Sequence, residues 1–448
     1  MNFASTRDHD NQATFSGAVF AGLASDGGLF VPILIPKLSL PDISNVLNTP
    51  DIHRLGLALL KYFVPEISES DLFQDLTSSI NFPVPLIHLQ DNIFLLEVFH
   101  GPTLAFKDIG ARFMARIISR ILQHRHLTLD ILVATSGDTG SAVAAGFYQV
   151  PHVRVHVLYP SGRITHLQEQ QMATYGENIF PIEVEGSFDD CQNLVKSILQ
   201  DRPFAEKNNL FFSTANSINV ARLLPQLIYH AWGVVQLHQQ HSLNNPVMSV
   251  PSGNFGNLVS AIYAHARGIP MNHFIAATNV NMTFPEYLAT GQFTARPSQK
   301  TFSSAMDVGN PSNFERLENF YQYSAANMRN AISALPINDE LTLKTIRDIF
   351  ETTEYIADPH TAVGIAAAKK YIALKNSTDP VIVTATAHPA KFPEVIKKAL
   401  GENISLDMPA SLQAVIDRPK LSYRMLATID AFKAKLCADR DANTIFSS

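Results

Sequence analysis

Lys107 is the residue whose surroundings in this sequence most suggest covalent chemistry. It lies in residues 100–116, HGPTLAFKDIGARFMAR, after a Gly-Pro turn and the apolar triplet Leu-Ala-Phe. A lysine amine in apolar surroundings has a lowered pKa, and it then becomes a nucleophile toward aldehydes. The alternative is a solvated lysine, which is the commoner situation for this residue type. Lys107 is therefore the first candidate for a catalytic residue.

A loop rich in small residues lies further along the chain. Residues 252–257, SGNFGN, follow a predicted strand and open a predicted helix. Small residues let backbone N–H groups approach an anion, and the helix N-terminus adds positive potential. The pattern is neither the GxGxxG of a dinucleotide site nor the GxxxxGK[ST] of a P-loop. It predicts a phosphate cradle, although a plain glycine-rich turn explains the loop equally well.

A second loop, residues 134–142 (ATSGDTGSA), has the same position between a strand and a helix. The hydroxyls of Ser136 and Thr139, with the backbone of Gly137 and Thr139, could bind a second anion, such as a substrate carboxylate or phosphate. Asp138 stands at a helix start, where a cap is the commoner role. Taken alone, this loop leaves both interpretations open.

Lys107 and the phosphate cradle are more informative together than apart. A lysine that can form a Schiff base and a loop that binds phosphate are the minimal equipment for pyridoxal phosphate. Thr386 adds a possible contact, because a hydroxyl at the carboxyl end of a parallel strand faces the crevice where ligands lie. It could hydrogen-bond a cofactor ring nitrogen. His388 and Lys391 follow it and could be ligands or polar residues at a helix start, and for His388 the second interpretation is favoured.

Residues 216–226, NSINVARLLPQ, contain a further candidate for anion binding. Ser217, Asn219 and Arg222 are the polar residues in question, and arginine is suited to binding a phosphate with two parallel hydrogen bonds. An exposed helix arginine is the alternative, and the pattern alone favours it.

Helices and strands alternate along most of the chain. The predicted strands cover residues 93–99, 130–135, 153–159, 179–184, 247–251, 273–278 and 381–386. Because helices separate them, right-handed crossovers and parallel sheets are expected. We expect a helix over 70–80 with Ser70 as N-cap, a capping box of Ser187 and Asp190, and a helix over 218–240 that Pro225 interrupts.

Two further segments in the second half of the chain have patterns that predict their structure. Residues 279–313 are rich in Thr, Ser, Pro and Gly, which predicts irregular structure that could hold a mobile cover. A helix is expected over 319–335. The chain beyond residue 405 offers little chemistry.

Composition excludes several classes of function. The 448 residues are 46% hydrophobic and 17% charged, with a net charge of -6 and no basic run, so nucleic-acid binding has little support. Cys191 and Cys437 provide neither a disulfide framework nor a zinc spacing, and no metal site is expected. The start is polar, and no apolar stretch is long enough to span a membrane. A cytoplasmic enzyme of two or three domains is expected.

Several motifs, in this order, resemble the threonine synthases: STRD, GLASDGGLFVP, FHGPTLAFKD, ATSGDTGSA, NSINVARLLPQ, VPSGNFGN, MDVGNPSNFER and TATAHPAKF. The resemblance runs from the N-terminus to about residue 400, and the tail after residue 405 matches no useful motif. It implies an α/β protein of the fold type II pyridoxal-phosphate class, similar to the tryptophan synthase β subunit. The expected parts are an N-terminal domain (1–90) and two open, mostly parallel α/β domains (91–240, carrying the lysine, and 241–448, carrying the phosphate loop).

The resemblance also implies roles for individual residues. Lys107 is similar to the Schiff-base lysine, and Thr386 to the hydroxyl residue that faces the pyridine nitrogen. The cofactor phosphate is expected at Gly253, Asn254, Phe255, Gly256 and Asn257. The substrate carboxylate is expected at Ser136, Gly137, Asp138 and Thr139, and the substrate's own phosphate at Ser217, Asn219 and Arg222.

The reaction that the resemblance implies converts O-phospho-L-homoserine and water to L-threonine and phosphate, by γ-elimination and β-hydration. The partner is thus a small molecule, with no nucleic acid and no membrane, and the chain is expected as a monomer or homodimer. The nearest alternatives are a related phospholyase and a serine/threonine dehydratase. A catalytically silent metabolite-binding protein is the alternative from another class, and an intact Lys107 argues against it.

Overall fold

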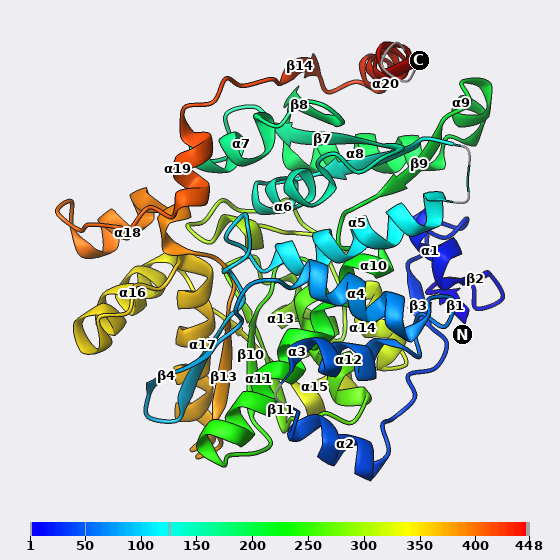
Figure 1. The fold of residues 1–448 in the computed structure, drawn as a ribbon. Coiled ribbons are helices and arrows are strands. Elements are labelled where there is room, and N and C mark those ends of the chain that lie inside the picture. The colour runs from blue at the N-terminus through cyan, green and yellow to red at the C-terminus, as the bar shows by residue number, and fades with distance from the viewer. Residues whose placement is uncertain (1, 50, 124, 126, 445–448) are drawn as a thin grey trace.

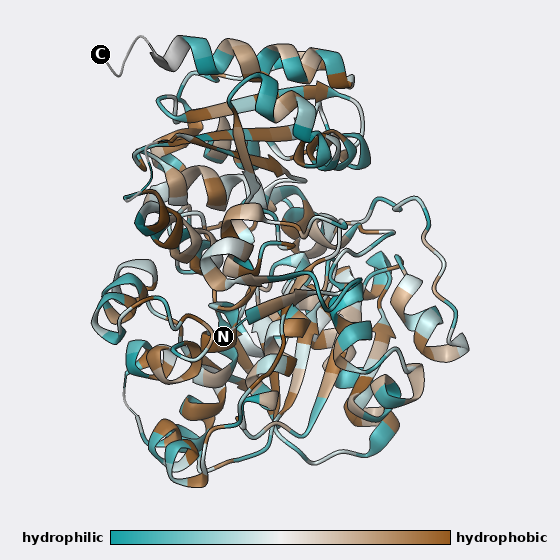
Figure 2. Ribbon diagram, turned by 90° about the vertical axis from the view of Figure 1, so that its right-hand side faces the viewer, coloured by the Kyte–Doolittle hydropathy of each residue, from teal (hydrophilic) through white to brown (hydrophobic). Residues whose placement is uncertain are grey.

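The computed structural model of the chain describes residues 2–49, 51–123, 125 and 127–444. In this part of the chain, three sheets organise the structure: a small one near the N-terminus and two larger ones, each covered by helices on both faces (Figure 1). The strands of the larger sheets are mostly hydrophobic along their length (Figure 2). Such continuous apolar strands are typical of parallel sheets buried on both sides.

The N-terminal sheet is antiparallel, with the order β2-β1-β3. Its elements and the helices that follow are β1 (Asn2–Ser5), β2 (Gln12–Thr14), α1 (Phe15–Ala21), β3 (Phe30–Pro32), α2 (Leu40–Leu47), α3 (Ile52–Leu60) and α4 (Glu69–Ser79). The N-cap of α4 is Ser68, whose side chain accepts a hydrogen bond from Asp71 N at 3.1 Å. The expectation of Ser70 was therefore wrong by two residues, because both serines precede a carboxylate and only the fold selects between them.

The larger of the two remaining sheets has six strands in the order β12-β11-β10-β13-β5-β4, and only the β4–β5 pair is antiparallel. The strands are β4 (Leu86–Gln90), β5 (Ile93–Glu97), β10 (Val247–Pro251), β11 (His273–Thr278), β12 (Ile332–Pro336) and β13 (Val381–Ala385). Alternate residues enter different hydrophobic clusters: Phe94 and Met248 lie on one face, and Leu95 and Val247 on the other. Both faces are thus buried, as the hydrophobic strands predict.

Helices on the two faces of this sheet come from different parts of the chain. The helix α17 (Pro359–Lys375) packs on β10, β11 and β13, with α16 (Asp339–Thr353) and α18 (Pro393–Leu400) beside it. The helices α12 (Gly256–Ala266) and α13 (Thr283–Thr290) cover the opposite face. The predicted break at Pro225 is confirmed, because α10 (Val220–Leu223) ends just before it and α11 (Gln226–His241) begins just after it.

The other large sheet has five strands, all parallel, in the order β14-β8-β7-β6-β9. The strands are β6 (Leu129–Ala134), β7 (Val153–Pro160), β8 (Ile179–Glu185), β9 (Phe211–Thr214) and β14 (Tyr423–Leu426). The helices around it are α5 (Lys107–Gln123), α6 (Asp138–Phe147), α7 (His166–Ala173), α8 (Phe188–Gln200), α9 (Arg202–Lys207), α19 (Ala410–Ile416) and α20 (Ile429–Thr444). The capping box of Ser187 and Asp190 at the start of α8 is confirmed.

Sheet membership differs from the expected division at residues 90 and 240. The strands β4 and β5 pair with strands from the second half of the chain, and β14 joins the sheet built from residues 129–214. The chain thus crosses between the two sheets three times: between β5 and β6, between β9 and β10, and between β13 and β14. Domains defined as continuous residue ranges cannot match these sheets, because each sheet contains strands that are far apart in the sequence. Pairing between distant strands produces no local sequence pattern.

Two further expectations were wrong in part. The segment 279–313 is not wholly irregular, since it contains α13 and a short 3-10 turn, η1 (Ser304–Met306). The helix expected over 319–335 is replaced by α14 (Phe314–Phe320), α15 (Ala325–Ala331) and the edge strand β12. The strand β12 forms because β11 offers it a partner, and that contact is not visible in the local pattern.

No helix within the described ranges combines the length and the apolar composition needed to cross a bilayer. Both cysteines are free thiols.

Candidate active site

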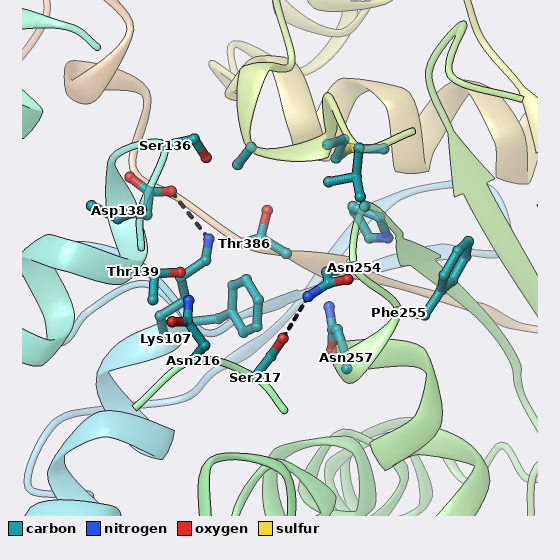
Figure 3. A pocket seen from close by; sticks show the side chains of 18 of the residues that line it. Lys107, Ser136, Asp138, Thr139, Asn216, Ser217, Asn254, Phe255, Asn257 and Thr386 are labelled. Carbon is teal, nitrogen blue, oxygen red and sulfur yellow. Dashed lines mark hydrogen bonds and ion pairs between the residues drawn. The ribbon is translucent and has the colours of Figure 1, made fainter. Parts of the chain in front are cut away.

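The candidate active site is a pocket between the two large sheets (Figure 3). Many of its lining residues lie in loops that follow the carboxyl ends of strands from both sheets, which is where open α/β sheets bind ligands. From the six-stranded sheet come the loops after β5, β10 and β13, which carry Lys107, residues 253–257 and Thr386. From the five-stranded sheet come the loops after β6 and β9, which carry residues 135–139 and 216–217.

Lys107 is the first residue of α5, and the turn before it is fastened to the end of β13. Phe106 N donates to the carbonyl oxygen of Thr386 at 2.9 Å, and His388 N donates to that of Leu104 at 3.1 Å. These bonds place Lys107 beside Thr386, whose side chain lies at the centre of the pocket (Figure 3). Only 16% of the Lys107 side chain is exposed.

Burial lowers the pKa of the Lys107 amine, and the nearby positive charges of Lys391 and Arg222 lower it further, whereas the Asp138 carboxylate opposes the shift. A lowered pKa increases the fraction of neutral amine, which is the nucleophilic form. Lys107 is thus buried with a lowered pKa, as expected, but its amine lies among charged groups and not in apolar surroundings. The linkage of Lys107 to a cofactor stays a prediction.

Asp138 is neither the helix cap nor the anion ligand that the sequence suggested. Gly137, and not Asp138, is the N-cap of α6, and it makes no side-chain capping bond. The Asp138 carboxylate lies between two lysines: Oδ1 is 2.7 Å from Lys391 Nζ, and Oδ2 is 3.4 Å from Lys107 Nζ. Burial alone would raise its pKa, but Lys391 and then Lys107 hold that pKa well below its usual range. An ionised carboxylate repels an anion, so the Asp138 side chain does not suit a substrate carboxylate.

The loop after β10 is built for close approach of an anion. A Cβ at Gly253 would lie 2.7 Å from Met306 Cα, so only glycine fits there. Phe255 has a φ of 59°, and α12 begins at the next residue, so the first amides of this helix lack partners within the helix. Asn254 ties the loop to its surroundings, because its amide donates to Ser217 Oγ at 2.8 Å (Figure 3).

Asn257 supplies a further donor in the same loop. Its Oδ1 accepts hydrogen bonds from the Tyr229 hydroxyl at 2.6 Å and from His230 Nε2 at 2.9 Å. Its Nδ2, although buried, has no hydrogen-bond partner in the structure. A buried donor without a partner is costly and indicates a ligand acceptor. The loop therefore fits a phosphate, and a phosphate of pyridoxal phosphate in particular, given Lys107 in the same pocket.

Arg222 is buried, with 2% of its surface exposed, and it lines the pocket. One of its terminal nitrogens donates to the carbonyl oxygen of Ala215, while Nε has no hydrogen-bond partner. Burial lowers its pKa to about 10, and it remains a cation at neutral pH. Within the described residues, no carboxylate lies within ion-pair distance of it, so the pocket holds a buried positive charge suited to an anionic ligand.

The predicted substrate contact of Asn219, in contrast, has no support in the pocket lining, which does not include this residue. It is fully buried as the N-cap of α10 and accepts a hydrogen bond from Ala221 N at 3.0 Å. Its amide donates to the carbonyl oxygens of Val19 and Thr214. All its polar atoms are thus used to hold the chain together. The neighbouring Asn216, which lines the pocket beside Ser217, was missed because both asparagines occur in the same polar motif.

Ser136, Thr139 and Ser217 line the pocket as expected, and the loop after β6 faces the loop after β10 across it (Figure 3). His360 and Gln226 also line it and were not singled out. His360 accepts a hydrogen bond from Ala305 N at 3.1 Å and contacts Asp358 at 2.8 Å. No motif marks His360, and Gln226 is the last residue of NSINVARLLPQ, where nothing distinguishes it; both become neighbours of Lys107 only through folding. Nowhere in the described residues do three or more His, Cys, Asp or Glu side chains form a group that could hold a metal ion.

Three family descriptions match consecutive parts of the chain. "Threonine synthase N terminus" matches residues 2–80, "Pyridoxal-phosphate dependent enzyme" residues 78–386, and "Threonine synthase, C-terminal" residues 361–435. The last match corrects the view that the tail after residue 405 resembles nothing useful. That tail has no catalytic motif, and its similarity therefore escapes a search for chemistry.

Similar proteins and solved structures agree with these matches. The chain is 40% identical to a threonine synthase of Escherichia coli (strain K12), over 97% of this chain and 98% of that protein. A threonine synthase of Saccharomyces cerevisiae is 33% identical, over 89% of each chain. The crystal structure of threonine synthase from Escherichia coli superposes with a TM-score of 0.91 and 38% identity, covering 98% of this chain and all of that one. A structure of PLP-bound threonine synthase from Brucella melitensis has a TM-score of 0.88 and 32% identity, covering 98% and 99%.

Proposed function

The chain belongs to the threonine synthase family of pyridoxal-phosphate-dependent lyases, and from this premise we propose that it converts O-phospho-L-homoserine and water to L-threonine and phosphate in the pocket around Lys107. The observation that carries the substrate assignment is Arg222, a buried cation without a carboxylate partner among the described residues, which lies in the same pocket as the phosphate-binding loop. The loop 253–257 would bind the phosphate of the cofactor, and Arg222 would bind the phosphate of the substrate.

The residues of the pocket fit the cofactor in three places. The loop 253–257 would hold the phosphate, with the Asn257 amide and the first backbone N–H groups of α12 as donors. Lys107 would hold the aldehyde carbon, and Thr386 would hydrogen-bond the ring nitrogen. When bound, pyridoxal phosphate supplies an electron sink for the negative charge that develops on the substrate carbons.

Lys107 would act as the base and acid of the reaction. Its lowered pKa increases the fraction of neutral amine, which is the form that could take the proton from the substrate Cα. The same nitrogen can then carry protons to and from Cβ. The side chain is mostly buried, so bulk water does not compete for these transfers.

The substrate's two anionic groups would contact different residues of the pocket lining. Arg222, with Ser217 and Asn216 next to it, is suited to the phosphate that leaves from the γ carbon. The backbone of residues 136–139, with the hydroxyls of Ser136 and Thr139, is suited to the carboxylate. Asp138 is not a ligand in this scheme.

Product analysis tests the proposed function. The cofactor-loaded protein is incubated with O-phospho-L-homoserine, and phosphate, threonine and keto acid are measured separately. We expect phosphate and threonine in equal amounts. Phosphate with a keto acid and no threonine would instead indicate a phospholyase or dehydratase.

The covalent link has its own test, which needs no substrate. Borohydride reduction of the loaded protein, followed by peptide mass spectrometry, should place the cofactor on Lys107. Lys107→Ala should abolish both this label and the visible absorption of the loaded protein. A label on any other lysine would contradict the assignment.

A cytoplasmic monomer or homodimer is also proposed, consistent with a small phosphorylated substrate, and light scattering would distinguish the two states.

A further inference from the structure

We propose that Lys391 is a positioning residue: it binds Asp138 and the turn before Lys107, and so limits how strongly the Asp138 carboxylate holds a proton on the Lys107 amine. Lys391 lies in the short turn η2 (Pro389–Lys391), shortly after Thr386, and it is fully buried without lining the pocket itself. The inference rests on Lys107 as the cofactor-linked lysine of the proposed function. The inference explains why the buried ammonium group of Lys391, which does not line the pocket, lies so close to Lys107.

The geometry makes Asp138 a shared partner of two lysines. Lys391 Nζ lies 2.7 Å from Asp138 Oδ1, whereas Lys107 Nζ lies 3.4 Å from Oδ2. The amide of Gln168 also donates to Oδ1 at 2.9 Å. The carboxylate is therefore already bound by Lys391 and Gln168, and Lys107 makes the longer contact.

Lys391 also holds the turn that carries Lys107. Its Nζ donates to the carbonyl oxygen of Thr103 at 2.9 Å, and Gln171 donates to the same oxygen at 3.2 Å. Thr103 in turn donates through its backbone N and its hydroxyl to Asp108, at 2.9 and 2.7 Å. One ammonium group thus joins three segments around Lys107: the turn before it, the start of α6 and η2.

The charges around Lys107 oppose each other in sign. Asp138 favours the protonated amine, while Lys391 and Arg222 disfavour it. Lys391 is the strongest influence that keeps Asp138 ionised, followed by Lys107 and His360. Asp108 and His388 also interact with Lys391. Without Lys391, the whole negative charge of Asp138 would face Lys107 and would stabilise its protonated form, which is not a base.

The test measures the titration of Lys107 directly, in protein without cofactor or substrate. Trace labelling with an amine reagent at a series of pH values, followed by peptide mass spectrometry, gives the midpoint at which Lys107 becomes reactive. We expect Lys391→Met, which keeps the length of the side chain, to raise this midpoint by on the order of one pH unit, as removal of a nearby charge does. The acidic limb of the pH–kcat profile of the loaded enzyme should move in the same direction.

Three variants separate this role from a merely structural one. Lys391→Arg retains the charge and should leave the midpoint near that of the unchanged protein. Asp138→Asn removes the opposing charge and should lower the midpoint. Lys420→Met removes a lysine from a different ion pair, with Glu169 and Glu183 outside the pocket, and should change nothing at Lys107.

An unchanged or lowered midpoint in Lys391→Met, with a normal melting curve, would overturn the inference. If that variant does not fold, the comparison of Asp138→Asn with the unchanged protein decides: a lowered midpoint supports the coupling, and no shift overturns it. The proposed function can fail independently, because its own test is the formation of threonine from O-phospho-L-homoserine.

Discussion

At the scale of single residues, the pocket is a set of buried charges that do not cancel. Asp138 is matched by Lys391 and Lys107, whereas Arg222 has no carboxylate within ion-pair distance in the described part of the chain. Burying a charge costs much unless it is paired, so an excess of positive charge is stable only if an anion completes it. The pocket is therefore complementary to a ligand that carries phosphate.

Arg222→Met should weaken binding of the phosphorylated substrate while leaving the cofactor in place. Loss of a charge-assisted hydrogen bond costs about 1.5–3 kcal/mol, roughly a 10- to 150-fold fall in kcat/KM. Inhibition by inorganic phosphate should weaken in parallel, as measured in steady-state assays. The visible absorption of the bound cofactor should stay the same.

Arg112→Met is a matched control for this substitution. Arg112 lies on α5 and is partly buried, and it donates to the carbonyl oxygens of Ser78 and Ser79, outside the pocket. It should lower the melting temperature without changing phosphate inhibition. If both variants affect phosphate inhibition equally, Arg222 is not the specific ligand.

At the scale of elements, strand order brings the candidate residues together. The strands β10, β13 and β5 are neighbours in one sheet, and the three segments that follow them carry the phosphate loop, Thr386 and Lys107. The strands β6 and β9 are neighbours in the other sheet and carry residues 135–139 and 216–217. Parallel pairing puts all these loops at the carboxyl edges, and the two edges face one another across the pocket.

Gly253→Ala tests the fit of the loop between β10 and α12. The added methyl group would meet the backbone of residues 305 and 306, at 2.8 Å from Ala305 O and 2.7 Å from Met306 Cα, and the loop would have to move. We expect the dissociation constant for pyridoxal phosphate, measured by absorption titration, to rise at least roughly tenfold, the equivalent of about 1.4 kcal/mol. Gly17→Ala in α1, where the nearest atom is 3.3 Å away, should not change it.

The helix α20 is joined to the five-stranded sheet by a buried histidine. His156 Nε2 lies 2.9 Å from Asp130, and its Nδ1 lies 3.4 Å from Asp439 of α20. Burial alone would lower the pKa of His156, but the bond to Asp130 and the Asp439 carboxylate raise it above its usual value. Arg154, which binds Asp130, and Lys435, which binds Asp439, are the cations beside these carboxylates.

His156→Gln should therefore destabilise the protein in a pH-dependent way. A group with a raised pKa in the folded state contributes stability fully below its unfolded pKa, about 6.5. That contribution is lost as the pH rises through the pKa that the group has in the folded state. The difference in melting temperature between the two proteins should thus be larger at pH 6 than at high pH, in roughly the range above 8.

His273→Gln provides the comparison for this prediction. Burial and then Lys375 lower the pKa of His273, so its contribution is present at high pH and lost as pH falls. The two variants should show opposite trends. If the difference in melting temperature between His156→Gln and the unchanged protein does not vary with pH, a charged His156 does not join the sheet to α20 through Asp130 and Asp439.

At the scale of the whole molecule, the C-terminal residues complete a sheet built mostly from the first half of the chain. The strand β14 pairs with β8, and Phe432 and Leu436 of α20 pack with Leu194 and Ile198 of α8. The N-terminal unit is likewise held to distant segments, since Arg316 donates to the carbonyl oxygen of Phe30. These contacts predict one cooperative structure around the pocket.

Phe432→Ala tests this cooperativity. Phe432 is fully buried, and removing a buried aromatic ring costs about 3–5 kcal/mol of the free energy of unfolding. We expect that loss in urea unfolding, with cofactor release and loss of helical signal in the same transition. Leu426→Ala in β14, where the side chain is 60% exposed, should have a small effect. Separate transitions for the cofactor and the helices would contradict a single unit.

Much of the local structure could be predicted from the sequence alone. The strands β10 and β11, the break at Pro225 and the capping box at Ser187 were all expected, because apolar periodicity, proline and capping residues act within a few residues of themselves. The lysine in its apolar turn and the SGNFGN loop were recognisable for the same reason, since each carries its chemistry in one short stretch.

The tertiary structure alone decided what depends on distant partners. It assigned β12 and β14 to sheets, used the side chain of Asn219 for structure, and placed Asp138 between two lysines that are 284 residues apart in sequence. The role of Asp138 cannot be read locally, since a carboxylate after Gly137 suits a helix cap as well as an ion pair. The free energy that selects between them comes from charges that only folding brings together.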